Sequence, residues 1–124
     1  MIFVSTSCVK ADKIKDSIIQ LAREGFTNIE LSGGTNYYDG YINDLFELKE
    51  KFNLNYLIHN YFPPPKNHIV INLASLNDNV YEESVNHVQN SLNLATLLSI
   101  PKIGFHAGFL IDPFVKELGN PIAK

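Results

Sequence analysis

Two of the four histidines in the sequence end short apolar runs of similar composition. His59 follows the run Tyr-Leu-Ile, and His106 follows the run Ile-Gly-Phe. If both runs are strands of one parallel sheet, both imidazoles lie at the sheet edge where α/β proteins place their ligands. Two imidazoles bind a divalent metal when carboxylates complete the shell. The alternative is that each histidine is a hydrogen-bonded strand-end residue without a ligand.

Four further residues lie near the same expected edge. Glu30 is the only acidic residue inside an expected strand, and a buried carboxylate needs a metal, a cation or a hydrogen-bond donor. We therefore predict a catalytic or substrate-related role for Glu30, with a carboxylate held by backbone or water as the alternative. Ser32 opens a Ser-Gly-Gly turn that either presents N–H groups to an anion or is an ordinary turn. Asn60 and Tyr61 are predicted to contact substrate, although Tyr61 fits aromatic packing within its loop equally well.

The remaining histidines and one aspartate have simpler interpretations. His68 falls in an expected loop and His87 on an expected helix, and we expect both side chains to be solvated. Asp112 precedes a proline and is predicted to be a turn residue rather than a ligand.

The elements that must position these residues follow from the hydrophobic periodicity. The order is β-α-β-α-β-α-β, with strands at 2–6, 28–32, 55–60 and 102–108 and helices at 10–24, 41–52 and 78–99. Three consecutive prolines prevent regular structure between the third strand and the third helix. The apolar stripe expected on that helix contains Tyr81, Val85, Val88, Leu92, Ala95 and Ser99, and it is widened by Leu94, Leu97 and Leu98. Strands separated by helices predict parallel pairing with right-handed crossovers.

Composition narrows the function classes. The chain has 124 residues, 45% of them hydrophobic, which suits one globular domain. A net charge of -3 argues against a broad nucleic-acid-binding surface. The single cysteine is compatible with a reducing compartment, and we see no signal peptide and no membrane span. The expected location is cytoplasmic.

Three segments together carry a family resemblance. Ile58-His-Asn-Tyr-Phe, Ile71-Asn-Leu-Ala-Ser and, after the long helix, Ile103-Gly-Phe-His-Ala-Gly occur in this order. In combination they resemble the xylose-isomerase-like TIM-barrel superfamily, which includes sugar-phosphate isomerases and epimerases and the endonuclease IV type of nuclease (AP endonuclease family 2). The resemblance covers essentially the whole chain.

The resemblance implies a divalent metal (Zn, Mn or Mg) for which His59 and His106 match histidines at the ends of strands three and four. In the nuclease branch these histidines are metal ligands, whereas in the isomerase branch they more often contact substrate or solvent. Glu30 matches no nuclease ligand, but a glutamate after the second strand is common in isomerase-like members.

The family's main acidic ligands come from strands five to eight. A full barrel needs roughly 200 residues or more. We therefore expect residues 1–124 to form the N-terminal half of a (β/α)8 barrel as a partial domain, with an incomplete metal shell and no turnover alone. Its unpaired sheet edges predict association, including a homodimer.

Three functions remain open at this stage. The first is a fragment of a metal-dependent sugar or sugar-phosphate isomerase or epimerase. The second is a fragment of an endonuclease IV-like enzyme, which is weakened because the loops after strands two and three contain only one basic residue, Lys66. The third is a non-catalytic βα-repeat module that binds a ligand or a partner, and a flavodoxin-like sheet is a further possible fold.

Overall fold

The computed structural model describes residues 1–117. Within them, three parallel strands form one open sheet in the order β1-β2-β3: Val4–Ser5, Asn28–Leu31 and Asn55–Ile58. The helices are α1 (Ile14–Arg23), α2 (Tyr41–Phe52) and α3 (Asp78–Leu97), with short 3-10 turns η1 (Thr6–Cys8) and η2 (Val115–Glu117). The predicted α/β class and parallel pairing are therefore confirmed for three strands.

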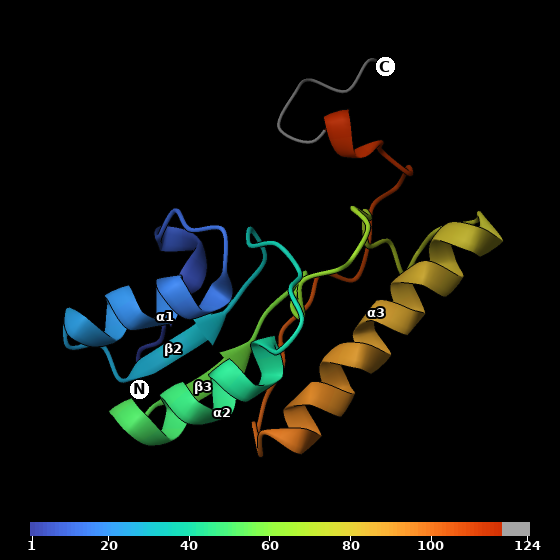
Figure 1. The fold of residues 1–124 in the computed structure, drawn as a ribbon. Helices are drawn as coiled ribbons and strands as arrows, with labels where there is room; N and C mark the ends of the chain where they lie inside the picture. The colour runs from blue at the N-terminus through green and yellow to red at the C-terminus, as the bar shows by residue number, and fades with distance from the viewer. Residues whose placement is uncertain (118–124) are drawn as a thin grey trace.

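The helices lie on defined sides of this sheet. α1 and α2 lie beside each other along the sheet, and α3 runs past the β3 side (Figure 1). α3 begins at an asparagine cap, because the Asn77 side chain accepts hydrogen bonds from the backbone N–H groups of Asn79 and Val80. It ends at Leu97 with Leu98 as its cap, and it is followed by Ser99 at a φ of 53° and by Pro101 two residues further on.

The prediction of a fourth strand at 102–108 is wrong. The described chain forms only an isolated parallel bridge between Ile58 and Ile103, and the Gly104 N–H donates to the Ile58 carbonyl at 2.8 Å. Beyond this point the backbone leaves the ladder, since the Phe109 N–H is bound by the Asn72 side chain. The described sheet therefore has three strands and stays open.

The first strand is also shorter than the expected 2–6. It ends at Ser5 because Thr6 begins η1, and the Ser5 hydroxyl accepts a hydrogen bond from the Ser7 N–H at 3.3 Å. Ile2, expected in a buried strand, is exposed.

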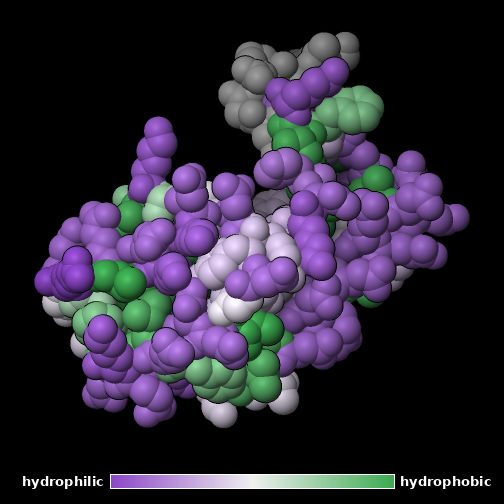
Figure 2. Space-filling model, viewed as in Figure 1, coloured by the Kyte–Doolittle hydropathy of each residue, from purple (hydrophilic) through white to green (hydrophobic). Residues whose placement is uncertain are grey.

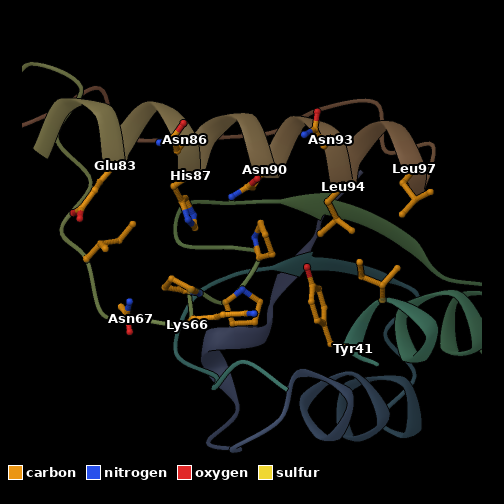
Figure 3. Close-up of a pocket in the computed structure, with 15 residues that line it drawn as sticks. Tyr41, Lys66, Asn67, Glu83, Asn86, His87, Asn90, Asn93, Leu94 and Leu97 are labelled. Carbon is orange, nitrogen blue, oxygen red and sulfur yellow. The ribbon is translucent and has the colours of Figure 1, made fainter. Parts of the chain in front are cut away.

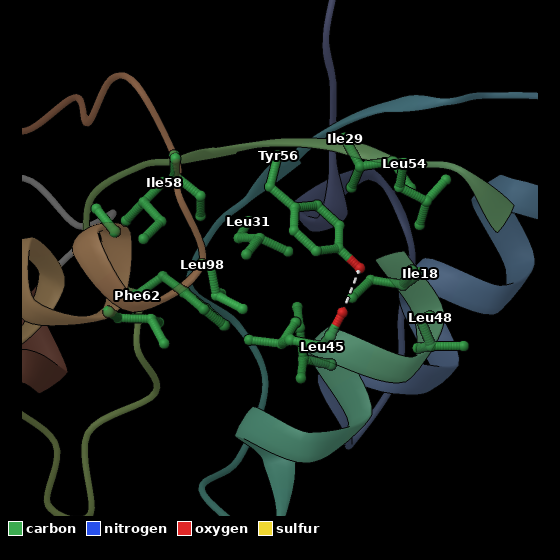
Figure 4. Close-up of a cluster of buried hydrophobic side chains, with 14 of the residues drawn as sticks. Ile18, Ile29, Leu31, Leu45, Leu48, Leu54, Tyr56, Ile58, Phe62 and Leu98 are labelled. Carbon is green, nitrogen blue, oxygen red and sulfur yellow. Dashed lines mark hydrogen bonds between the residues drawn. The ribbon is translucent and has the colours of Figure 1, made fainter. Parts of the chain in front are cut away.

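The core lies on the sheet face toward α1 and α2. The register pairs Ile29 with Tyr56 and Leu31 with Ile58, so these four side chains share one face. Figure 4 shows them packed around Leu45, whose carbonyl accepts a hydrogen bond from the Tyr56 hydroxyl at 3.3 Å. Each fully buried large aliphatic side chain contributes about 1.5–3 kcal/mol. The other buried members include Ile14, Ile18, Leu21, Leu48, Leu54, Phe62, Leu94 and Leu98.

The buried face of α3 agrees with the expected stripe at Leu94 and Ala95 and differs from it elsewhere. Tyr81, Val85 and Leu92 are 47%, 39% and 44% exposed. The buried positions are Ser84, His87, Ser91, Leu94 and Ala95. The helix is rotated toward the proline segment, where small polar side chains fit against backbone. The Ser91 hydroxyl donates to the Phe62 carbonyl at 2.6 Å.

The surface seen in Figure 2 is mostly hydrophilic, with apolar groups in separate small patches. Among the helices of residues 1–117, none combines the length and apolar character needed to cross a bilayer.

Candidate functional site

Glu30 and His59 meet at the carboxyl ends of β2 and β3. Side chains alternate along a strand, so both point to the face opposite the buried Ile29, Leu31 and Ile58. The distance from Glu30 Oε1 to His59 Nδ1 is 3.3 Å. A carboxylate at Nδ1 favours the tautomer with its proton there, which leaves Nε2 as the nitrogen with a free lone pair.

His106 lies beside this pair. The ring centroids of His59 and His106 are 5.6 Å apart, with the ring planes inclined by 39°. The Gly104 N–H donates to the Ile58 carbonyl, which holds this segment beside the end of β3 and places His106 two residues further on next to His59. The two histidines that the sequence placed at one edge are therefore neighbours, although only one of them follows a full strand.

A cavity of about 390 Å³ opens at this edge. Its lining consists of Ser32, Gly33, Gly34, His59, Asn60, Tyr61, His106 and Phe109. Every site residue predicted from the sequence except Glu30 belongs to this lining. Glu30 lies behind His59, so its contact is with the imidazole.

The Ser-Gly-Gly turn is held by Thr6, a residue that sequence reasoning missed. The Ser32 N–H donates to Thr6 Oγ1 at 2.9 Å, and Thr6 Oγ1 donates to the Ser32 carbonyl at 3.5 Å. The Ser32 N–H is thus occupied within the fold. A Cβ on Gly33 would lie 2.7 Å from the Tyr61 Cβ, so close packing requires glycine there. The turn interpretation accounts for these contacts.

The side chains of Asn60 and Tyr61 differ in their hydrogen bonding. Asn60 Oδ1 is buried and has no hydrogen-bond partner in the described part of the chain. Tyr61 has a φ of 63°, and its hydroxyl accepts a hydrogen bond from the Ile71 N–H at 3.2 Å. The Tyr61 ring is therefore fixed, while Asn60 retains an acceptor beside the cavity.

Asn72 connects the loop after β3 to the segment that carries His106. Its Oδ1 accepts from the Phe109 and Ala74 N–H groups at 2.9 and 3.1 Å. Its Nδ2 donates to Asp112 Oδ1 at 2.6 Å, and the Ser75 hydroxyl donates to the other Asp112 oxygen at 2.7 Å. Asp112 is thus an acceptor for two side chains from a distant loop. A buried asparagine with its amide fully bonded holds this segment in place.

The donor set fits a divalent metal in part. His59 and His106 supply two imidazoles, and Glu30 supplies an outer partner that orients one of them. Within residues 1–117, no group of three or more His, Cys, Asp or Glu side chains is placed to hold a metal. A four-coordinate ion bound here would need further ligands.

Comparison with known proteins adds no assignment. No known protein family matches the chain, and no curated protein matches it significantly. The coordinates establish an α/β fold with three parallel strands alternating with helices.

Proposed function

We propose that the strand-end cavity is part of the active site of a divalent-metal-dependent sugar or sugar-phosphate isomerase or epimerase. One observation carries the proposal: the Glu30 carboxylate is 3.3 Å from Nδ1 of His59, beside the His106 imidazole. This is the arrangement by which a carboxylate orients a metal-binding histidine.

The proposed roles follow from the contacts. His59, through Nε2, and His106 would hold the metal, which when bound would supply Lewis-acid polarisation of a substrate carbonyl. Asn60 Oδ1, which is buried without a partner, accepts a hydrogen bond from a substrate hydroxyl. Tyr61 offers its fixed ring to the apolar face of the sugar. Glu30 acts through His59 as a positioning residue, which replaces the catalytic role expected from the sequence.

The described residues do not supply the proton transfer. Isomerisation needs a general base within hydrogen-bond reach of the proton next to the carbonyl. No carboxylate of residues 1–117 lines the cavity, and Glu30 is engaged by His59. We therefore propose that residues 1–117 contribute the metal-binding and sugar-binding groups of the site and not its general base.

The experiment is an NMR titration of the ¹⁵N-labelled chain with D-xylulose and with D-ribulose 5-phosphate, each with and without Zn²⁺. The proposal expects backbone amide shifts at Ser32, Asn60 and Tyr61 that need both sugar and metal. Shifts produced by an abasic-site DNA duplex in place of the sugars would support the nuclease alternative. Sugar shifts that are independent of metal would support a simple ligand-binding module. Either of these results, or no shift at all, contradicts the proposal.

A further inference from the structure

A second cavity lies between α3 and the proline segment 63–65, and it shares no lining residue with the strand-end cavity. Its volume is about 570 Å³, and Tyr41 and Ile42 of α2 form part of its wall. We call it the outer groove. Figure 3 shows the α3 side chains above this space, with Tyr41 and Lys66 on the opposite side. Its size is typical of a small-ligand site.

His87 is a buried polar residue in the wall of the outer groove. The sequence predicted a solvated side chain, but His87 is only 6% exposed. Its ring points from α3 toward the groove, and its Nε2 has no hydrogen-bond partner in the described part of the chain (Figure 3). Burial lowers the pKa of His87 below its ordinary 6.5, so the ring is neutral at pH 7 and has one donor and one acceptor. A buried polar atom without a partner costs about 1–3 kcal/mol.

A row of amides runs beside His87. Asn86, Asn90 and Asn93 lie on successive turns of α3 and line the groove, with Asn67 contributed by the loop. Each amide offers a carbonyl acceptor and an NH₂ donor. Gln89 Nε2 donates to Asn93 Oδ1 at 3.0 Å, so this oxygen already accepts one hydrogen bond within the helix.

The rest of the lining is apolar or balanced in charge. Prolines 63–65, Ile42, Ile69, Leu94 and Leu97 provide the apolar surface. Glu83 and Lys66 are the charged residues of the lining, one of each sign, and the Lys66 ammonium lies 4.8 Å from the centre of the Tyr37 ring. The groove therefore lacks the basic cluster that a phosphate or nucleic acid requires and the carboxylate set that a hard cation requires.

We propose that the outer groove binds an uncharged, polyhydroxylated ligand of the oligosaccharide class. Hydroxyl groups both donate and accept, as the asparagine amides and the neutral His87 do. The C–H faces of sugar rings pack against the prolines and leucines. The α3 wall from Glu83 to Leu97 spans roughly 20 Å at about 1.5 Å per residue, which suits several rings in a row.

An extended peptide fits the amide row less well. Its backbone groups on one side repeat about every 6.7 Å. Along α3, the step from Asn86 to Asn90 is about 6 Å and the step from Asn90 to Asn93 is about 4.5 Å. These unequal steps do not match a regular backbone repeat, whereas hydroxyls on sugar rings occur at several spacings.

The test is an NMR titration of the ¹⁵N-labelled chain with maltotriose, cellotriose and xylotriose, each to ~10 mM, a concentration that nearly saturates a site with a Kd of about 1 mM. We expect at least one trisaccharide to give saturable shifts at the Asn86 and Asn90 side-chain amides and the His87 ring. Asn90→Ala, at an exposed position, weakens binding about fivefold to tenfold. Asn79→Ala, on the first turn of the same helix and outside the groove, leaves it unchanged.

Three results would overturn the proposal. They are no saturable shift with any trisaccharide, shifts that Asn90→Ala does not weaken, and saturable shifts at the same signals from an acetylated Val-Ala-Val-Ala amide in place of the sugars. The inference is independent of the metal site: in His59→Ala the trisaccharide shifts remain, whether or not zinc binds the wild-type chain.

Discussion

Glu30 and His59 form a carboxylate–imidazole pair across two adjacent parallel strands, with 3.3 Å between Oε1 and Nδ1. The register places Glu30 opposite Leu57, two positions before the histidine, so the contact is diagonal. It gives the glutamate a partner and orients the imidazole at the same time. The proposed metal site depends on this relationship.

Removal of the Glu30 carboxylate should weaken zinc binding. We expect Glu30→Ala to raise the zinc Kd about 10-fold to 100-fold, the usual effect of losing an outer partner of a metal-binding histidine. Isothermal titration calorimetry at pH 7 measures it. Glu24→Ala, which removes an exposed carboxylate at the end of α1, is the matched control and should bind zinc as the wild type does. Equal affinities for wild type and Glu30→Ala would show that the pair has no part in metal binding.

The Asn72 amide should hold the His106 segment in place. Asn72→Ala removes the hydrogen bonds to the Phe109 N–H and to one oxygen of the Asp112 carboxylate, at a cost of about 2 kcal/mol in unfolding free energy for the two bonds. Gly108→Ala should act similarly, since its Cβ would clash with Asn72 Oδ1 and lie 2.9 Å from the Ala74 N. Urea unfolding gives the stability, and hydrogen exchange at Phe109 reports the local release.

One outcome would contradict this role of the Asn72 amide. If Phe109 exchanges at the wild-type rate in Asn72→Ala, the segment is held by something else. Asn79→Ala, an asparagine replacement on the surface of α3, serves as the control and should change the stability by less than about 0.5 kcal/mol.

The alternation of strands and helices was predictable because each unit follows a local hydrophobic rule. β2, β3 and α2 lie within two residues of their expected bounds. The absence of the fourth strand was not predictable. The run Ile103-Gly-Phe has the local pattern of a strand, but the backbone after it is hydrogen-bonded to Asn72 of a distant loop instead of to β3. The buried face of α3 was predicted only in part for a similar reason: Ser91 donates to the Phe62 carbonyl, and Tyr81, Val85 and Leu92 of the expected stripe are exposed.

The site was predictable where strand position decided it. His59 and His106 lie close together as predicted, although the parallel neighbour of β3 is a single bridge at Ile103 and not the expected strand. The contact of Glu30 with His59 depends on register, and the buried His87 depends on helix rotation, neither of which the sequence specifies. The buried polar residues of α3 include Ser84 and His87, which are three positions apart and therefore share one face of the helix. This spacing is the sequence signal that could have indicated the face.

His87 should make the fold sensitive to mild acid. Its pKa is lowered by burial in the folded chain, so between that value and the ordinary 6.5 the unfolded chain binds a proton that the folded chain does not. The unfolding free energy is therefore unaffected by this group well above pH 6.5 and falls as the pH drops below it, by at most about 1.4 kcal/mol per pH unit. Urea unfolding between pH 5 and 8 measures the slope.

The control for this pH dependence is His87→Gln. The variant should lose the part of the slope due to this imidazole. Identical slopes for wild type and variant between pH 5 and 8 would contradict the assignment.

Ser91 should anchor the proline segment to α3. Its hydroxyl donates to the Phe62 carbonyl at 2.6 Å in a buried position, so Ser91→Ala should cost about 1–3 kcal/mol of unfolding free energy. Thr96→Ser is the matched control, because it keeps the exposed hydroxyl that donates to the Leu92 carbonyl at 3.0 Å. Thermal unfolding compares the two. A Ser91→Ala protein as stable as Thr96→Ser would show that the contact contributes nothing.

The central claim is that His59 and His106 bind one divalent metal together. The most direct measurement is a zinc titration of the histidine-labelled chain, followed through the imidazole ¹⁵N and ¹³C signals. The account predicts that the His59 and His106 signals shift together and saturate at one zinc ion per chain, while His68 and His87 stay unchanged. It also predicts that His59→Ala abolishes the His106 shift. Zinc that leaves both signals unmoved, or a His106 shift that persists without His59, would contradict it.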